Sequence, residues 1–327
     1  MRTCRLYGIT LASDFPFAAP LDAAGSTASG VPDLTFSVCL EAPVPALWQR
    51  ERPIYRSPWR TEDGESASFL YRAPGFEVLR FPGVLDFYLW PDRILCHLID
   101  PQLQFLVELR LLGPVLAYWL ELRGAAALHA SAVVFGGDRS DRDRAAGFLS
   151  THGGGKTGLA AALLRAGGAL LTDDLLPVEE RGGLFLGHPG YPQMRMWPDE
   201  ATWFLGGCDD LPLVHPELTK RRVPAGPDGF GAFWDRPAPL ACLYLPERRP
   251  EPHGPVEIHP VAPRDAVIEL VRHSFSPFLV EAVGLQPGRF DRFARLVRQV
   301  PVRRLSYPSG FDRLSVVAEA LQHDLEC

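Results

Sequence analysis

Lysine is scarce in this chain. Only two of its 33 basic residues are lysine, Lys156 and Lys220, which leaves 31 arginines to carry surface charge and solubility. A lysine that remains in such a chain is expected to do something that arginine does poorly. Its compact ammonium group can thread between loop amides to reach a phosphate oxygen, where a wide planar guanidinium fits poorly. Both lysines are therefore candidate functional residues.

Closely spaced cysteines are also missing. The six cysteines are scattered along the chain without a CxxC pair, whereas a zinc ribbon or a disulfide framework shows tight, repeated spacing. The pattern argues against both kinds of site and predicts reduced thiols in a cytoplasmic protein.

Long apolar runs are absent as well. The first residues, MRTCRLYGITLASDF, lack the apolar core of a signal peptide. The longest apolar stretch, 111–120, is too short to span a bilayer and is bracketed by Arg110 and Glu121. The sequence therefore predicts neither an export signal nor a membrane partner.

Basic charge does not dominate the composition. The net charge of −6 is the opposite of what a general nucleic-acid binder carries. The arginine pairs at 221–222 and 303–304 are typical of solvated rims, so we expect no nucleic-acid partner. A length of 327 residues with 46% hydrophobic content fits a soluble, well-cored chain of one large or two modest domains.

The first part of the chain predicts a β-rich domain. Residues 15–60 are rich in proline, alanine, glycine and serine, which is typical of loops and short edge strands. Four short runs between 67 and 99 are separated by Pro-Gly or Pro-Asp turns and predict an antiparallel meander. Apolar residues at helical spacing over 101–123 predict one long helix that ends at Gly124. We expect residues 1–123 to form an N-terminal domain that includes this connecting helix.

The second part, residues 124–327, predicts an α/β domain. Its first half has the pattern of a β-loop-α-β unit: a strand at 126–135, a charged hairpin tip at 136–144, a strand at 146–150, a helix at 156–165 and a strand at 169–172. Further strands are expected at 240–245 and 256–261, and helices at 265–273, 288–300 and 312–325. The predicted fold class is a P-loop-containing α/β sheet preceded by a β-rich domain.

A glycine-rich loop joins the strand at 146–150 to the following helix. Its sequence, Ser150-Thr-His-Gly-Gly-Gly-Lys-Thr157, resembles the phosphate loop G-x-x-x-x-G-K-[ST]. In such a loop, backbone N–H groups and the helix N-terminus face phosphate oxygens. Lys156 would contact the phosphates of ATP, and the Thr157 hydroxyl would bind Mg²⁺.

The loop departs from the strict pattern at its first position. Ser150 replaces the first glycine, although Gly153, Gly154 and Gly155 still supply backbone freedom for a tight turn and are expected to bind the nucleotide. His152 either contacts a phosphate or faces solvent. The alternative reading is a glycine-rich turn that happens to hold a lysine.

Asp173 and Asp174 end the next strand, 17 residues beyond Lys156, counted to Asp173. A doubly wound sheet delivers acidic groups beside a bound nucleotide at this position. Adjacent side chains on an extended chain face opposite ways, so both could reach the site only if the chain kinks. One carboxylate would then hold Mg²⁺ while the other accepts a proton from an attacking hydroxyl. The alternative is an aspartate pair that caps a turn.

Three further residues complete the predicted site. His129 lies on the strand before the loop and is either a buried core residue or a residue that reaches the phosphate side. Arg195 could clamp a phosphate or a carboxylate of the acceptor. Lys220 lies in a basic triplet that is either a solvated rim or an anion contact.

These motifs together resemble the catalytic domain of the HPr kinase/phosphorylase family. The resemblance is carried by LHASAVVF, GFLSTHGGGKTGLAAALLRAGG and LLTDDLLPVE, and it is specific over residues 125–180. Two later segments, 190–200 and 301–307, are similar to HPr-kinase-related proteins of peptide-modification gene clusters. Residues 1–120 show no such likeness.

The resemblance implies ATP-dependent transfer of a phosphoryl group to a serine hydroxyl, with Mg²⁺. It implies that Lys156 and Thr157 contact phosphate and metal, that Asp173 is the catalytic base and Asp174 a metal ligand, and that His129 lies beside the transferred phosphoryl group. The order within the aspartate pair could be reversed. The family's second glycine-rich signature, which serves dephosphorylation, is not found here, so kinase activity alone is expected.

The acceptor implied is a serine of a ribosomally made peptide, such as a lasso-type precursor. A small-molecule kinase on the same scaffold and a non-catalytic nucleotide-binding regulator are the alternatives. The N-terminal domain would be free to recognise the acceptor, and the sequence leaves a homo-oligomer open. Phosphoenolpyruvate carboxykinase has a similar phosphate loop, but its additional metal-binding lysine and histidine pattern is not evident.

Overall fold

The computed structural model describes residues 1–21, 30–43, 51–136, 143–151, 153–250 and 254–326. The chain forms two compact units. Unit 1 comprises Met1–Ala125 together with Phe275–Arg289, and unit 2 comprises Ala126–Ser274 together with the chain from Phe290 onward. The predicted boundary after residue 123 lies close to this division, but it placed Phe275–Arg289 in the second domain, whereas these residues pack in unit 1.

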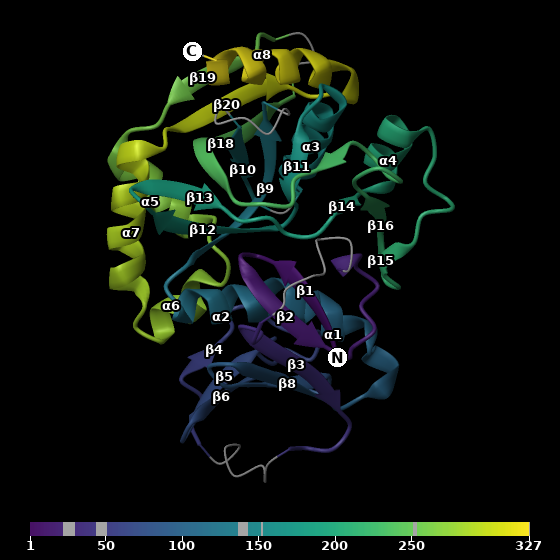
Figure 1. Ribbon diagram of the computed structural model, residues 1–327, viewed down its shortest axis with the longest axis vertical. Coiled ribbons are helices and arrows are strands. Elements are labelled where there is room, and N and C mark those ends of the chain that lie inside the picture. The colour runs from purple at the N-terminus through teal and green to yellow at the C-terminus, as the bar shows by residue number, and fades with distance from the viewer. Residues whose placement is uncertain (22–29, 44–50, 137–142, 152, 251–253, 327) are drawn as a thin grey trace. The chain divides into compact units, whose positions relative to one another are not determined.

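Unit 1 is built on an eight-stranded sheet (Figure 1). The strands lie in the order β1-β2-β3-β8-β7-β6-β5-β4, with bounds β1 Arg2–Leu6, β2 Ile9–Ser13, β3 Leu34–Cys39, β4 Tyr55–Arg56, β5 Phe69–Ala73, β6 Phe76–Phe81, β7 Leu85–Leu89 and β8 Arg93–Leu98. Strands β5 to β8 pair antiparallel in sequence order, which confirms the predicted meander.

The expectation of only edge strands within 15–60 is wrong for β3. This strand lies inside the sheet, where it pairs in parallel with both β2 and β8. Its alternating residues Leu34 and Phe36 are fully buried, as expected for a strand that packs one face on a core. The loop composition around β3 hid this short alternating run.

The single helix predicted over 101–123 is also wrong. The segment consists of a 3₁₀ turn at Pro101–Leu103, helix α1 (Phe105–Arg110), a π-helical stretch at Leu111–Val115 and helix α2 (Leu116–Leu122). Gly113 leaves the helical conformation, with φ −112° and ψ −106°, immediately before Pro114. Proline lacks a backbone N–H and its ring clashes with the preceding turn, so the helix is interrupted there. Gly124 has φ +86° beyond the end of α2, as a helix-ending glycine should.

A buried ion pair explains why the segment 275–289 belongs to unit 1. Arg289 Nη2 donates to Glu121 Oε1 at 2.7 Å, and both side chains are almost completely inaccessible to solvent. Helix α6 (Pro277–Ala282), which the sequence reading missed, precedes this arginine and contacts α2 and β4. The long-range pairing of two charged residues leaves no local signal in the sequence.

A second buried polar cluster lies on the sheet of unit 1. Asp86 is 2% exposed, and Arg80 and His97 lie 3.7 and 4.0 Å from its carboxylate. Burial raises the pKa of Asp86 to about 6, although the charges of Arg80 and His97 oppose the shift. Burial therefore outweighs the two basic neighbours.

Unit 2 is built on a nine-stranded sheet. The order is β17-β11-β9-β12-β13-β18-β20-β19, and β10 pairs with β9 and β18. The bounds are β9 Ala126–Phe135, β10 Arg144–Leu149, β11 Ala169–Thr172, β12 Leu175–Arg181, β13 Leu184–Gly187, β17 Ala232–Phe233, β18 Ala238–Arg249, β19 Glu257–Pro260 and β20 Val302–Pro308. Residues 137–142 of the predicted charged tip lie outside the described residues, and the hairpin itself is confirmed by the pairing of Phe135 with Arg144.

The predicted β-loop-α-β unit is confirmed, with one addition. Strands β10 and β11 are joined by helix α3 (Lys156–Arg165), and both pair antiparallel with β9, which therefore lies between them. The long strand β9 thus brings His129 near the residues that follow β11. Figure 1 shows α3 alongside these strands.

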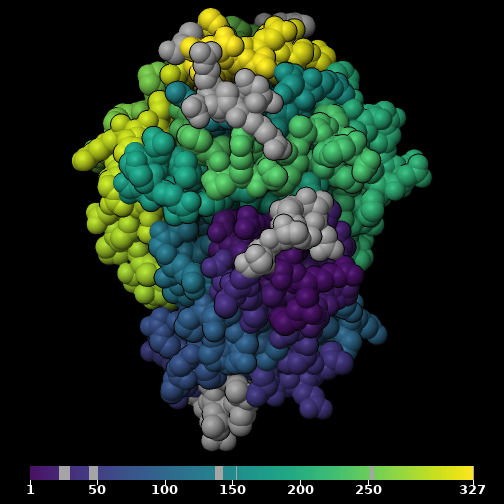
Figure 2. All heavy atoms as spheres, viewed as in Figure 1, coloured from purple at the N-terminus to yellow at the C-terminus, as the bar shows by residue number. Residues whose placement is uncertain are grey.

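Helices cover both faces of this sheet. Helices α3 and α8 (Leu314–Glu326) share one buried apolar cluster, whereas α5 (Pro263–Arg272) and α7 (Gln286–Gln299) contribute to another. Figure 2 shows α8 in yellow on the surface of unit 2. The predicted helices correspond to α5, α7 and α8 with ends shifted by a few residues.

A small three-stranded sheet, β14-β16-β15, completes unit 2. It consists of β14 (Gln193–Met196), β15 (Leu213–His215) and β16 (Leu218–Pro224), and helix α4 (Pro198–Leu205) follows β14. This sheet carries two predicted site residues, Arg195 on β14 and Lys220 on β16. Among the described residues, no helix is both long and apolar enough to cross a membrane.

Candidate phosphate-binding site

The glycine-rich loop runs from the end of β10 to the start of α3. Gly155 occupies the N-cap position of α3 in a left-handed conformation, and no side chain of the described residues caps this helix end. The N–H groups of the first helical turn have no partners within the helix itself. They form a concave, electropositive end that suits an anion.

Backbone conformation and close packing together require the three consecutive glycines. Gly153 has φ +77° with open space around it, so only its backbone conformation favours glycine. A Cβ at Gly154 would lie 2.4 Å from Ser150 Oγ and 2.6 Å from Ser150 Cβ. A Cβ at Gly155 would lie 2.8 Å from Tyr307 Oη. The serine that replaces the first glycine of the motif is thus accommodated because residue 154 has no side chain.

Lys156 lies inside the loop and is only 8% exposed. Its Nζ donates to the carbonyl oxygens of Ser150 at 2.9 Å and Thr151 at 3.4 Å. Burial lowers the pKa of Lys156, the charges of Asp174 and Asp173 oppose this effect, and the charge of Lys220 adds to it. The ammonium group is therefore coupled electrostatically to both aspartates and to the other lysine of the chain.

Asp173 is tied into the scaffold by three hydrogen bonds. Its Oδ1 accepts from Thr157 Oγ1 at 3.1 Å and from the hydroxyl of Ser131, and its Oδ2 accepts from the backbone N–H of Arg195 at 2.9 Å. The residue is 5% exposed. Since an ionised carboxylate offers about four acceptor positions, Asp173 has about one position left for a further donor or a metal ion.

Asp174 has a different environment. Its φ of +95° places it in the left-handed region, which turns its side chain toward the site and supplies the kink that the sequence argument required. Its carboxylate accepts from His129 Nε2 and from Arg195 Nη1, both at 3.0 Å. Burial acts to raise the pKa of Asp174, but the hydrogen bond from His129 and the charges of Arg195, His129 and Lys156 hold it below its usual range. The side chain remains 28% exposed.

His129 is not a core residue. Its side chain is 30% exposed and bonds to Asp174, and its residue pairs with Leu175 across β9 and β12. Its backbone N–H donates to the carbonyl of His273 at 2.7 Å. The side chain thus lies beside Asp174 rather than in the core, and its contact with a phosphoryl group stays a prediction.

Arg195 joins the two aspartates. Its backbone contacts Asp173, its guanidinium contacts Asp174, and its Nη2 also donates to Tyr191 Oη at 2.7 Å. The expected clamp on a phosphate or an acceptor carboxylate remains a prediction, because in this structure the guanidinium serves Asp174. Sequence reasoning missed Ser131 and Tyr191, since a serine on a strand and a tyrosine in a loop carry no specific signal.

Lys220 lies beside the same region. Its Nζ is 4.9 Å from the ring centroid of Trp197, and its charge acts on the pKa of Lys156 and of Glu200. Burial raises the pKa of Glu200, and Asp173 adds to the effect. The two lysines of the chain are far apart in sequence, but they lie close enough in the fold for the charge of Lys220 to act on the pKa of Lys156.

A pocket of about 140 Å³ adjoins the loop. Its lining includes Gly155, Glu200, Arg248, Tyr307 and Phe311. Arg248 Nη2 donates to the carbonyl of Gly153 at 2.9 Å. Arg248 and Tyr307 were not predicted, although the similarity noted for 301–307 was a signal in the correct segment.

The residues present fit a shared magnesium ion. No three His, Cys, Asp or Glu side chains within the described part of the chain are grouped to hold a metal by themselves. Mg²⁺ usually binds one or two protein oxygens and completes its shell with water and nucleotide phosphates. The neighbouring oxygens of Thr157 and Asp173 suit that arrangement. The predicted contact at His152 lies outside the described residues.

No protein-family model matches the chain, and no curated protein matches it. A solved structure described as the Hpr(Ser) kinase/phosphatase from Coxiella burnetii is similar over 61% of this chain and 94% of that chain, with a TM-score of 0.30 and 11% identity. That protein is a distant structural neighbour of this mixed α/β chain.

Proposed function

We propose that this protein is a Mg²⁺- and ATP-dependent kinase that phosphorylates a serine hydroxyl. The hydrogen bond between Thr157 and Asp173 carries the proposal. It joins the start of the loop helix to the end of β11, so the candidate phosphate loop and the aspartate pair form one site. A glycine-rich turn with an incidental lysine has no reason to be tied to an acidic residue in this way.

The two aspartates would have different tasks, in the reverse of the order implied by the family resemblance. Asp173 already accepts three hydrogen bonds, one of them from Thr157. It is therefore suited to hold the metal side of the site in place. Asp174 is the more exposed of the two and would face the acceptor hydroxyl.

Asp174 would orient the hydroxyl and receive its proton late. Its lowered pKa makes it a weak base before reaction, but a loose phosphoryl-transfer transition state demands little proton abstraction beforehand. His129 and Arg195 hold the carboxylate in position from two sides. Such positioning supplies much of the rate in this class of reaction.

Lys156 and the loop amides would bind the triphosphate and stabilise its developing negative charge. Thr157 and Asp173 would hold magnesium when it is bound, and the ion would supply charge neutralisation at the phosphates. The Lys156 ammonium would exchange its two loop carbonyl partners for phosphate oxygens. The pocket beside Gly155 and Tyr307 would adjoin the nucleotide.

The choice of a peptide as acceptor rests on the sequence similarity of 190–200 and 301–307 to proteins of peptide-modification gene clusters. The experiment is transfer of labelled phosphate from ATP to serine-containing precursor peptides, with the matched serine-to-alanine peptide as control. We expect peptide-dependent ADP release and phosphoserine in the first peptide only. Lys156→Ala should reduce transfer by about 10²- to 10³-fold, as for removal of other transition-state charge stabilisers.

Two alternatives would give different results. Turnover with a small hydroxylated metabolite and none with peptides would identify a small-molecule kinase. Tight ATP binding without turnover on either class would identify a nucleotide-binding regulator, for which the serine at the first loop position gives some support. Retention of full transfer by Lys156→Ala would overturn the proposed site itself.

A further inference from the structure

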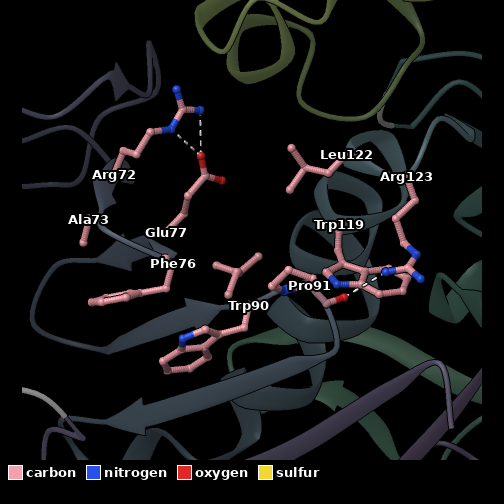
Figure 3. Close-up of a pocket in the computed structure, with 11 residues that line it drawn as sticks. Arg72, Ala73, Phe76, Glu77, Trp90, Pro91, Trp119, Leu122 and Arg123 are labelled. Atoms are coloured by element: carbon pink, nitrogen blue, oxygen red, sulfur yellow. Dashed lines mark hydrogen bonds and ion pairs between the residues drawn. The ribbon is translucent and has the colours of Figure 1, made fainter. Parts of the chain in front are cut away.

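Unit 1 contains a pocket that the proposed kinase activity does not use. It lies at one end of the sheet, where the turns between β5 and β6 and between β7 and β8 meet the C-terminal end of α2 (Figure 3). Its volume is about 480 Å³. That is within the range of about 300–1,000 Å³ typical of small-molecule sites, and it is larger than the pocket beside the phosphate loop.

The walls of this pocket are mainly aromatic and aliphatic. Phe76 and Trp90 pack together with ring centroids 5.3 Å apart, and Trp119 forms another part of the lining. Leu89 is buried in the wall, whereas Leu122 is 43% exposed near the opening. Flat apolar walls of this kind favour a planar ring, which gains contact area and ring stacking at the same time.

The charged residues that line the pocket differ in whether an oppositely charged side chain pairs with them. Glu77 is already satisfied, because Arg72 donates to its Oε1 at 2.8 and 2.7 Å and Tyr118 donates to its Oε2 at 2.6 Å. Figure 3 shows Arg72 and Glu77 on one side of the pocket and Arg123 on the other. Among the described residues of the lining, the only acidic one is therefore neutralised by its own neighbours.

Arg123 leaves a positive charge at the opposite wall. Its guanidinium stacks over Trp119, 4.3 Å from the ring centroid, and Nη1 donates to the carbonyl of Pro91 at 2.8 Å. Over the described residues, no carboxylate forms an ion pair with it. A guanidinium fixed by stacking on a ring is well placed to bind a carboxylate. The same charge disfavours a cationic ligand, although the aromatic lining alone would suit one.

We propose that this pocket binds an aromatic carboxylic acid, with the ring between the aromatic walls and the carboxylate on Arg123. The group could belong to a free aromatic acid or to the C-terminal aromatic residue of a peptide. Both sources present the same chemistry to Trp90, Trp119 and Arg123. The proposal does not depend on phosphoryl transfer in unit 2.

The test is calorimetric titration of the full chain with matched acids and amides. The probes are 3-phenylpropionate, N-acetylphenylalanine, a short peptide ending in phenylalanine, and the carboxamide of each. A charge-assisted hydrogen bond contributes enough for the acids to bind about tenfold or more tightly than the amides. Tighter binding of 3-phenylpropionate would indicate a free acid as the ligand, and tighter binding of the peptide would indicate a chain terminus.

Variants locate the site. Arg123→Gln should abolish the preference for acid over amide, and Leu122→Glu should weaken the acids by placing a competing carboxylate near Arg123. Arg93→Gln is the matched control, because Arg93 also stacks on a tryptophan, 4.1 Å from the Trp90 ring centroid, but does not line the pocket. It should leave affinity unchanged.

Nuclear magnetic resonance supplies a second readout. The indole N–H signals of Trp90 and Trp119, assigned with Trp90→Phe and Trp119→Phe, should shift on titration with the acids. Equal affinity for acid and amide, no binding of any probe, or equal losses in Arg123→Gln and Arg93→Gln would each overturn the proposal.

Discussion

The contact between Ser150 and Gly154 gives the sharpest test of the phosphate-loop geometry. A Cβ added at residue 154 would lie 2.6 Å from Ser150 Cβ, whereas ordinary contacts begin at 3.4 Å, so the overlap is 3.4 − 2.6 = 0.8 Å. Overpacking of this kind costs about 1–3 kcal/mol. Gly154→Ala should therefore destabilise the loop and weaken nucleotide binding.

The partner substitution should reverse this effect. Ser150→Gly removes both of the closest atoms, and the next nearest atom to the added Cβ is the carbonyl oxygen of Thr151 at 3.1 Å. By itself Ser150→Gly should cost only about 0.5–1 kcal/mol, through backbone entropy. In the Ser150→Gly background, Gly154→Ala should be tolerated, with a coupling free energy of about 1–2 kcal/mol between the two sites.

The assay is a double-mutant cycle with two readouts. The first readout is urea unfolding. Because the chain has two units and need not unfold in one step, the free energy is taken from the unfolding transition whose midpoint moves when nucleotide is added. Binding of a fluorescent ADP analogue is measured on the same four proteins. Gly153→Ala is the control: the space around Gly153 is open and its penalty comes only from φ +77°, so Ser150→Gly should not rescue it. An equal cost of Gly154→Ala in both backgrounds would refute the loop geometry.

Three further predictions concern charged groups. Asp174→Asn should reduce phosphoryl transfer by about 10²-fold or more with little change in nucleotide affinity, whereas Asp173→Asn should weaken Mg²⁺-dependent nucleotide binding. Single-turnover kinetics measure the first effect and equilibrium titration measures the second. The opposite pattern would restore the order of roles implied by the family resemblance. Because the pKa of Asp86 is raised to about 6 in the folded state, its stabilising contribution is complete below the unfolded pKa and is lost as the pH rises through 6. The loss is up to about 3 kcal/mol, and Asp86→Asn should flatten the unfolding free energy between pH 4 and 7 by that amount. Arg289→Met should cost about 3–5 kcal/mol in denaturant unfolding by removing the ion-pair partner of the buried Glu121 carboxylate, and adding Glu121→Leu should recover most of that cost.

The loop and its helix could be predicted because their signals are local. Glycine spacing, the rare lysine and the apolar pattern after it all lie within residues 150–165, and the structure places the helix over the range predicted for it. The aspartate pair was found from its distance along the chain. Its hydrogen-bond partners were not, because the donors to Asp173 include Ser131 on β9 and Arg195 on β14, which are distant in sequence.

The remaining differences between the predicted and the observed fold have two causes. One is pairing between residues far apart in sequence, and the other is a conflict between two local signals at Gly113. No sequence pattern states that β9 lies between β10 and β11, or that Arg289 pairs with Glu121 in unit 1. At Gly113 the signal was visible but misjudged, because the helical spacing of apolar residues outweighed the Gly-Pro pair. Backbone sterics decide such a conflict, since a missing N–H cannot be replaced by burial.

The placement of the two lysines supports the idea that this site is built for an anion. Lys156 is enclosed by its loop and donates to a loop carbonyl, that of Ser150. Arg248 donates to another carbonyl of the same loop, that of Gly153. Lys220 adds a second ammonium whose charge disfavours protonation of Lys156. Two cations that repel each other are unfavourable unless negative charge lies nearby. The aspartates supply part of that charge but are themselves bound by hydrogen bonds from His129, Thr157 and other donors, so a bound polyphosphate would complete the balance. Removal of Lys220 should therefore be less harmful to the empty protein than to its nucleotide complex.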